Sequence, residues 1–267
     1  MTPDSTVPTG STAGGLDDST YDELRQIAAR YPQPRSGLLP MLHLVQSVQG
    51  RITPEGIEAC ADLLDITAAE VSGVATFYTM YKRRPVGDYH VGVCTNTLCA
   101  VMGGDAIFER LKEHLDVGND ETTEPTAEGR SITLEHIECN AACDYAPVMT
   151  VNWEFMDNMT PQSATDLVDD LREGKEVRST RGPRIVTWRE AERVLAGFPD
   201  DLADEGPSAG AASLVGLGLA RRNGWTAPHH DTSGPTGSTA DTKTEAAEQA
   251  DTGRAQTETT AEEGHGA

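Results

Sequence analysis

The chain has 267 residues, 37% of them hydrophobic, and a net charge of −22, which allows one or two domains with a core of ordinary size. So acidic a chain argues against nucleic acid as a partner, since phosphate binding needs basic patches. Residues 1–16 carry no Lys, Arg or apolar run, and the longest apolar stretch is too short to span a bilayer. We therefore expect a cytosolic chain without direct membrane insertion, where clustered cysteines favour metal over disulfide.

Helical signals dominate residues 17–76, which we predict to form a helical domain. A first helix is expected over residues 19–30, and apolar residues recur at helical spacing over residues 38–48. Thr53 followed by Pro54 marks a helix start, because Pro is favoured at the first helical position. Thr67 and Glu70 have the spacing of a capping box, which opens one more short helix.

The pattern changes after Thr76 into short strands and helices that we assign to one domain over residues 77–175. β-prone runs at 77–81 and 89–93 flank a hairpin-like connection, and the second run leads directly to Cys94. The later predicted elements are a helix from 104, an exposed polar loop over 118–130, a strand over 132–138, a hairpin over 148–156 and a helix from Thr160. The fold class is therefore α+β, an N-terminal helical bundle followed by a small sheet with helices.

The remainder divides into an extension and a tail. The extension, residues 176–225, contains possible helices at 188–195 and 214–225, of which the second is a candidate for docking on a partner. The tail, residues 226–267, has eight acidic and two basic residues and no Leu, Ile, Val, Met, Phe, Tyr or Trp. Such a segment buries too little apolar surface to offset its ordering entropy, so we expect disorder there and in residues 1–16.

Four cysteines carry the chemistry of the chain. Cys94 and Cys99 form a C-x4-C pair, and after 39 residues Cys139 and Cys143 form a C-x3-C pair. This spacing favours a [2Fe–2S] cluster, with a structural zinc ion as the main alternative and two disulfides as a lesser one. Both pairs follow predicted strands, so they can meet at one edge of a sheet. Four cysteinate ligands leave no open metal position, which indicates electron transfer rather than substrate chemistry at the metal.

Other reactive side chains have simpler interpretations. Cys60 lies on the apolar face of its helix and is expected to be a buried structural thiol. His43 lacks a second ligand one helical turn away and is interpreted as a packed or surface histidine, and the pair at 229–230 falls in the tail. Phe77, Tyr78 and Tyr81 are expected to pack in a strand. No nucleophile elbow, P-loop or dinucleotide-binding fingerprint occurs, so no nucleotide site is predicted.

The motifs around these cysteines resemble a known family. They are RSGLLP at residues 35–40, GVATFYTMY at 73–81, VCTNTLC at 93–99, ECNAAC at 138–143 and APVM at 146–149. Together they resemble the E-subunit family of bacterial NADH:quinone oxidoreductase, respiratory complex I, whose members are thioredoxin-like [2Fe–2S] ferredoxins. The resemblance covers residues 17–174 and implies a thioredoxin-like second domain with Cys94, Cys99, Cys139 and Cys143 as the cluster ligands.

The resemblance also implies a place in a respiratory oxidoreductase. The chain would dock on the flavoprotein subunit that binds FMN and NADH, beside the large iron–sulfur subunit, in the peripheral arm on the cytoplasmic side of the plasma membrane. Its cluster would exchange electrons with the flavin, and no catalytic NADH site is expected on this chain. The alternatives are the equivalent diaphorase subunit of an NAD-dependent formate dehydrogenase or hydrogenase, and a zinc-stabilised interaction module.

One residue departs from the family pattern. Ala141 stands where the family usually has Gly in the second cysteine motif. If that position requires a positive φ angle, Ala adds strain to the loop. This expectation concerns the geometry of the loop and leaves the ligand set unchanged.

Overall fold

The computed structural model describes residues 15–202, 205–206 and 209–226. The predicted disorder of residues 1–16 and 226–267 therefore falls almost wholly outside the described residues. Leu16 is an exception, because it packs against the helical core and its N–H donates to Glu55 Oε1 at 3.2 Å. The chain divides into two compact units, residues 1–216 and 217–267. Within the described residues, no helix is long and apolar enough to cross a membrane.

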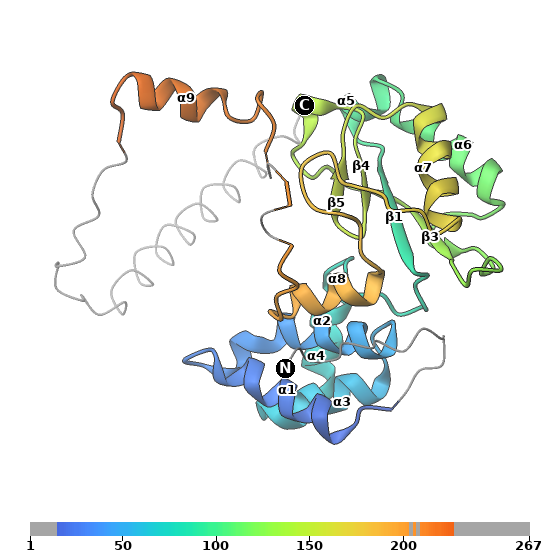
Figure 1. Cartoon of the computed structure of the whole chain (residues 1–267). Coiled ribbons are helices and arrows are strands. Elements are labelled where there is room, and N and C mark those ends of the chain that lie inside the picture. The colour runs from blue at the N-terminus through green and yellow to red at the C-terminus, as the bar shows by residue number, and fades with distance from the viewer. Residues whose placement is uncertain (1–14, 203–204, 207–208, 227–267) are drawn as a thin grey trace, which may run out of the picture. The chain divides into compact units, whose positions relative to one another are not determined.

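Four α-helices form the N-terminal part of the first unit, and Figure 1 shows how they are arranged. They are α1 (Asp18–Ala29), α2 (Leu38–Gln49), α3 (Pro54–Leu64) and α4 (Ala68–Phe77), with the short 3-10 helix η1 (Pro34–Gly37) before α2. Asp17 caps α1 and Thr53 caps α3, while Thr67 and Glu70 form the predicted capping box of α4. Their apolar faces meet in a common core that contains Cys60, which is completely buried. Burial raises the pKa of the Cys60 thiol to about 12, as expected of an inert structural cysteine.

The strand predicted over residues 77–81 is wrong. Phe77 ends helix α4, and the chain then turns. Phe77 is 78% exposed and Tyr78 is 40% exposed, whereas Tyr81 is buried and donates its hydroxyl hydrogen to Leu39 O at 2.9 Å. The capping box starts a helix that buries Val71 and Ala75 one turn apart, and this helix extends to Phe77, the first of the aromatic residues that suggested a strand.

A five-stranded mixed sheet forms the second part of the unit. Its strands are β1 (Tyr89–Cys94), β2 (Glu121–Thr122), β3 (Ile132–Ile137), β4 (Met149–Val151) and β5 (Glu154–Met156), in the spatial order β2-β3-β1-β4-β5. Strands β1 and β3 are parallel, in a register that runs from Tyr89 opposite Ile132 to Cys94 opposite Ile137. The other pairings are antiparallel, including the short strand β2, which lies in the segment predicted to be a loop.

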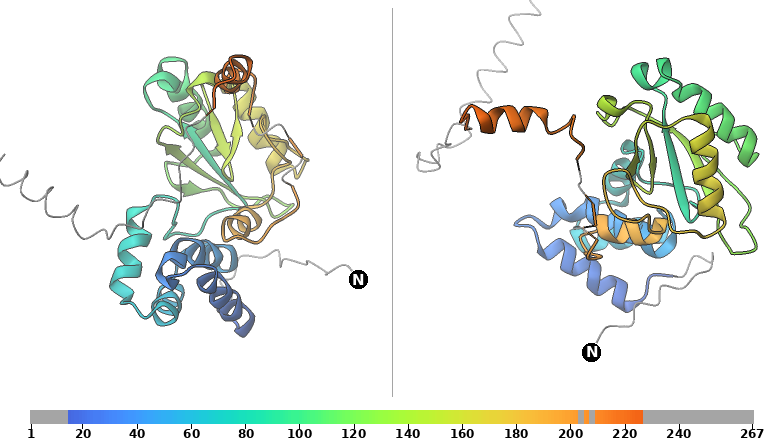
Figure 2. Two further views of the ribbon diagram at one scale, coloured as in Figure 1. Left: turned by 90° about the vertical axis from the view of Figure 1, so that its left-hand side faces the viewer. Right: turned by 45° about the horizontal axis from the view of Figure 1, so that its top comes forward.

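Two helices cover one face of this sheet. They are α6 (Gly104–Leu115) and α7 (Pro161–Arg172), which contact each other and lie on the same side of the strands in the right-hand view of Figure 2. Ile107 and Leu111 from α6 and Val168 and Leu171 from α7 pack in one core with the strands. The short helix α5 (Thr97–Val101), which the sequence did not predict, lies between β1 and α6 along the chain.

A buried ionic cluster ties β1 to β3 and to the segment before them. Glu135 Oε2 on β3 lies 2.7 Å from His90 Nε2 on β1 and 2.6 Å from Lys82 Nζ. Burial alone raises the pKa of Glu135, but the hydrogen bonds and charges of His90 and Lys82 outweigh it and lower that pKa to about 2. The carboxylate therefore holds the parallel strand pair together as an anion at neutral pH.

Helix α8 (Trp188–Leu195), in the extension, joins the two parts of the unit. It lies along α2 and contributes Glu192, which is completely buried. One Glu192 carboxylate oxygen lies 2.6 Å from His43 Nδ1 and accepts from Gln46 Nε2 at 2.7 Å, and the other accepts from Trp153 Nε1 at 3.0 Å. His43 and Gln46 belong to α2, whereas Trp153 connects β4 to β5. The packed histidine interpretation of His43 is thus confirmed.

Replacing Glu192 tests this connection. Glu192→Gln keeps the shape of the side chain but substitutes an amide for one acceptor oxygen, leaving a buried donor unpaired. We expect the free energy of unfolding to fall by about 1–3 kcal/mol. Thermal unfolding followed by circular dichroism measures the change, with Glu58→Gln on the exposed side of α3 as the control. Equal stability of the two variants would show that Glu192 does not join the parts.

Candidate metal centre

The parallel strand pair brings both cysteine motifs to one edge of the sheet. Cys94 is the last residue of β1, and Cys139 follows Ile137, the residue opposite Cys94 in β3, by two positions. Cys99 lies in α5, and Cys143 opens the 3-10 helix η2 (Cys143–Tyr145). Because parallel strands end at the same edge of a sheet, the loops after β1 and β3 face each other. The local core there contains Cys94, Cys99 and Ala142.

The sulfur atoms are arranged as two pairs of free thiols. Cys139 Sγ lies 3.5 Å from Cys143 Sγ, and Cys99 lies close enough to Cys94 to raise the pKa of its thiol. The pairs also interact electrostatically with each other, Cys94 with Cys139 and Cys143 with Cys99. Cys94 and Cys99 are buried, whereas Cys139 is exposed. Among the described residues, no three His, Cys, Asp or Glu side chains already surround one point as ligands of a single ion.

The protonation of these thiols reflects their crowding. Burial raises the pKa of Cys94 to about 11, with the Asn96 backbone N–H acting in the opposite direction and the Cys99 thiol adding to the rise. Hydrogen bonding with Cys139 raises the pKa of Cys143. Adjacent sulfurs disfavour each other's ionisation, and bound iron or zinc reverses this because metal ligation stabilises thiolates. The donor set therefore fits a cationic metal centre with four sulfur ligands.

Two glycines allow helix α6 to start directly against the first cysteine loop. A Cβ atom on Gly104 would lie 2.4 Å from Cys94 O and 2.9 Å from Cys99 O, so no other residue fits there without moving backbone. Gly103 has a φ angle of 117°, in the left-handed region that favours glycine. The chain therefore turns tightly here, and α6 closes the loop that carries Cys94 and Cys99.

The second loop contains the strained position expected from the sequence. Ala141 has a φ angle of 55°, in the left-handed region, and its N–H donates to Cys139 Sγ at 3.4 Å. The left-handed conformation costs an alanine about 1–2 kcal/mol, a penalty that glycine escapes. In this conformation the loop directs a backbone donor at the sulfur of Cys139.

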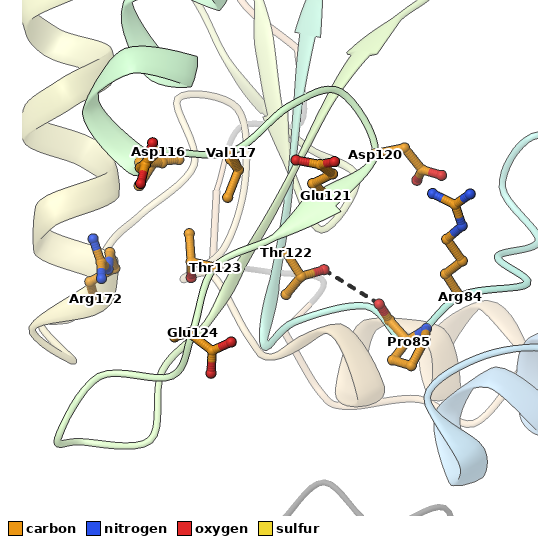
Figure 3. A pocket seen from close by; sticks show the side chains of 11 residues that line it. Arg84, Pro85, Asp116, Val117, Asp120, Glu121, Thr122, Thr123, Glu124 and Arg172 are labelled. Carbon is orange, nitrogen blue, oxygen red and sulfur yellow. Dashed lines mark hydrogen bonds between the residues drawn. The ribbon is translucent and has the colours of Figure 1, made fainter.

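A surface cavity of about 580 Å³ lies apart from the cysteines (Figure 3). Its charged lining residues are Arg84, Asp116, Asp120, Glu121, Glu124 and Arg172. The hydroxyl of Thr122 donates to Pro85 O at 3.4 Å across one side of it. None of the five cysteines lines this cavity, so it is not part of the candidate metal centre.

Comparison with known proteins identifies the family. The family model for the thioredoxin-like [2Fe–2S] ferredoxin matches residues 24–172. The chain belongs to this family. Membership implies a [2Fe–2S] cluster as the cofactor, and it confirms the predictions of a thioredoxin-like domain and of that cofactor. Which residues bind the cluster stays a prediction that the paired sulfur geometry supports.

Individual relatives agree with this assignment. The E subunit of the NADH-quinone oxidoreductase of Mycobacterium tuberculosis (strain ATCC 25618 / H37Rv) is 59% identical over 207 residues, 77% of this chain and 81% of the relative. NADH-quinone oxidoreductase subunit 2 of Thermus thermophilus is 34% identical over 172 residues, 63% of this chain and 93% of the relative. The predicted kinship with the E subunits of these oxidoreductases is therefore confirmed.

A solved structure shows a weaker likeness. The crystal structure of an NAD+-reducing [NiFe]-hydrogenase in the air-oxidized state matches 52% of this chain and 23% of that chain, with 18% identity and a TM-score of 0.45. This likeness is too low to support an argument about function.

The alanine pair of the second loop offers a test of the strain. Ala141→Gly relieves the left-handed conformation at some cost in unfolded-chain entropy, and we expect a gain in stability of up to about 1 kcal/mol. Ala142 has a φ angle of −103° and is 2% exposed. Ala142→Gly removes a buried methyl group without relieving strain and should cost about 1–2 kcal/mol.

The two variants are compared by the temperature at which the full chain loses its visible iron–sulfur absorption. Opposite signs are the expected result. A loss of stability in Ala141→Gly as large as that in Ala142→Gly would show that the loop carries no strain at Ala141.

Proposed function

We propose that this chain is the electron-transfer subunit of an NADH–quinone oxidoreductase and that Cys94, Cys99, Cys139 and Cys143 hold its [2Fe–2S] cluster. The observation that carries the proposal is that two loops, each with a pair of cysteines, leave the sheet at the same edge. In the second loop, Cys139 Sγ lies 3.5 Å from Cys143 Sγ. Two pairs of thiolates are the ligand set of a two-iron centre.

The chain's own residues supply the ligands and the electrostatic setting of the site. When bound, the cluster supplies a one-electron redox step between the reduced and oxidised states. The backbone N–H of Ala141 donates a hydrogen bond to the sulfur of Cys139 at 3.4 Å, and the backbone N–H of Asn96 acts on Cys94 in the same sense, by lowering the pKa of its thiol. Such bonds stabilise negative charge on sulfur and hold the ligands in place. The sheet and α6 exclude water from Cys94 and Cys99, both 1% exposed.

The partners follow from the same proposal. The electron partner is FMN on the flavoprotein subunit that also binds NADH, and the large iron–sulfur subunit lies beside it in the peripheral arm, on the cytoplasmic side of the membrane. The names of the relatives, NADH-quinone oxidoreductase subunits, support this placement. The NADH site then belongs to the flavoprotein subunit, and the chain alone does not oxidise NADH.

Ligand replacement tests the assignment. Cys99→Ser in the full chain, purified without oxygen, is expected to lose most of its iron and sulfide and the EPR signal of the reduced centre. Cys60→Ala, which alters a buried thiol of the helical core, should keep all three. A Cys99→Ser chain with undiminished iron, sulfide and EPR signal would contradict the ligand set. A zinc-containing, iron-free parent chain would instead favour an interaction module.

We further propose that helix α9 (Val215–Arg222) and its flanks dock on a neighbouring subunit of the oxidoreductase. Several large apolar residues of this segment are exposed: Leu214 44%, Val215 63%, Leu217 46%, Leu219 42% and Trp225 64%. A helix with so exposed an apolar surface gains stability by burying it against another protein.

Two truncations test the docking role of α9. Removing residues 214–267 should reduce the amount of partner subunits that co-purify with the chain from its native host, whereas removing only 227–267 should not. Equal recovery of partners with both truncations would contradict the docking proposal while leaving the cluster assignment intact.

A further inference from the structure

The extension beyond the family domain forms a turn that packs against strand β5. The match to the family model ends at residue 172, whereas this turn spans residues 178–184. Arg178 and Arg184 form an antiparallel bridge at its base, and Ser179 N–H donates to Pro183 O at 3.1 Å. Thr180 N–H donates to Phe155 O at 3.1 Å, which fixes the turn to β5. At its tip the turn carries Arg181.

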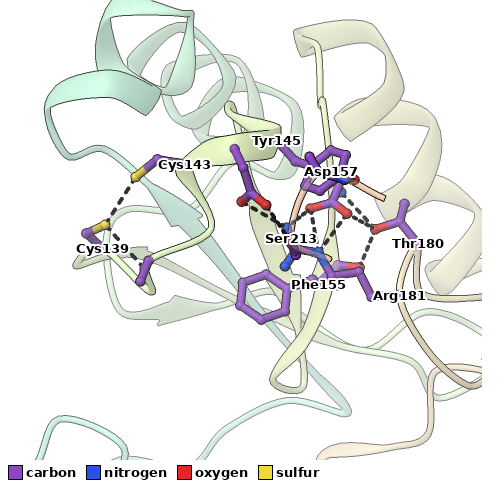
Figure 4. A network of polar contacts seen from close by, with 11 residues as sticks. Cys139, Cys143, Tyr145, Phe155, Asp157, Thr180, Arg181 and Ser213 are labelled. Atoms are coloured by element: carbon purple, nitrogen blue, oxygen red, sulfur yellow. Dashed lines mark hydrogen bonds and ion pairs between the residues drawn. The ribbon is translucent and has the colours of Figure 1, made fainter. Parts of the chain in front are cut away.

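The guanidinium of Arg181 is held in a largely buried and well-defined position. Its Nε lies 2.8 Å from Asp157 Oδ2 and its Nη2 lies 2.8 Å from Asp157 Oδ1, a two-pronged ion pair (Figure 4). The Arg181 side chain is 12% exposed and that of Asp157 is 8% exposed. The guanidinium also stacks over Phe155 and Tyr145, 4.6 Å and 4.9 Å from the ring centres. Only arginine combines a planar fork with stacking in this way.

Arg181 contacts two residues of the second cysteine loop, Tyr145 and Asp144. Tyr145 belongs to η2, the 3-10 helix that begins at Cys143, and Asp144 of the same helix lies 3.7 Å from Arg181 Nη2. A second piece of the extension holds η2 as well. Ser213 Oγ donates to Asp144 Oδ2 at 2.5 Å, and Ala212 N–H donates to the Tyr145 hydroxyl oxygen at 3.0 Å.

We infer that Arg181 is a positioning residue for the cluster, a fixed cation that clamps the turn after Cys143 and favours the reduced state. The inference rests on the proposed function, since it assumes that Cys143 is a ligand. The turn after Cys143 contacts a cation whose own position is set by Asp157, so the ligand loop cannot shift without losing the contacts of Tyr145 and Asp144 with Arg181. Reduction adds negative charge to a centre that already carries four thiolates, within an acidic chain. A fixed positive charge beside the loop offsets part of that cost.

Substitution of Arg181 in the full chain with its cluster tests the inference. Arg181→Gln removes one positive charge and so leaves the charges of Asp157 and Asp144 uncompensated, which makes reduction less favourable. We expect the redox equilibrium to shift about tenfold toward the oxidised state, a midpoint about 59 mV more negative for one electron. Arg181→Lys keeps the charge and should lie within about twofold of the parent. A potentiometric titration followed by EPR measures the midpoint.

A neighbouring arginine provides the matched control. Arg178 lies in the same turn, is about half exposed and pairs with the surface residues Glu176 and Glu205. Arg178→Gln removes an equal charge without touching η2 and should leave the midpoint unchanged.

If Arg181→Gln has the same midpoint potential as the parent chain, the inference is overturned, whatever the stability of the variant. It is also overturned if Arg178→Gln shifts the midpoint potential as much as Arg181→Gln does. If Arg181→Gln does not fold, Arg181→Met, whose stem keeps the ring contacts, gives the same decision. A parent chain without iron and sulfide would overturn the proposed function, an outcome distinct from a cluster whose potential ignores Arg181.

Discussion

The parallel pairing of β1 with β3 determines where both cysteine loops lie. It places Cys94 opposite Ile137, so the loops that carry the two cysteine pairs leave the sheet at the same edge. Parallel strands need a crossover connection, and α6 supplies it on one face of the sheet. Because α6 begins at Gly104, directly against Cys94 O, the crossover also closes the first cysteine loop. The pairing of β1 with β3 and the placement of α6 therefore together determine where the sulfur atoms lie.

Buried charges connect the parts of the unit around this sheet. Glu192 joins α2 to the turn between β4 and β5, Glu135 joins β1 to β3, and Asp157 fixes Arg181 against the second cysteine loop. Each carboxylate has more than one partner, as burial of a charge requires. Two of these links involve the extension beyond residue 172, so this segment is part of the fold rather than an appendage. It makes contacts with the helical core and with the loop of Cys143.

Local signals in the sequence predicted much of this fold. The start signals at Thr53 and Thr160, the apolar spacing of α6 and the runs that became β1 and β3 all act within a few residues. The strain at Ala141 was predicted because alanine stands there in place of the glycine usual in the family, at a position where a positive φ angle was suspected. The short elements α5 and β2 were missed, since elements of two to five residues depend on tertiary contacts more than on their own patterning.

The failures have two physical causes. Phe77 and Tyr78 were assigned to a strand from their residue types, but the helix started by Thr67 continued through Phe77. The partnerships of His43 with Glu192 and of Asp157 with Arg181 join residues 149 and 24 positions apart, and no spacing rule links such pairs. The cysteine motifs indicated the chemistry of the site, whereas the residues that hold its loops in place were visible only in three dimensions.

Native mass spectrometry of the full chain, prepared without oxygen, tests whether the four cysteines hold a two-iron cluster. We expect one dominant species, the chain with about two irons and two sulfides, and loss of this species when Cys94 or Cys139 is replaced by Ser. A dominant species that carries a single zinc ion, or a two-iron species that survives replacement of those cysteines, would contradict this expectation.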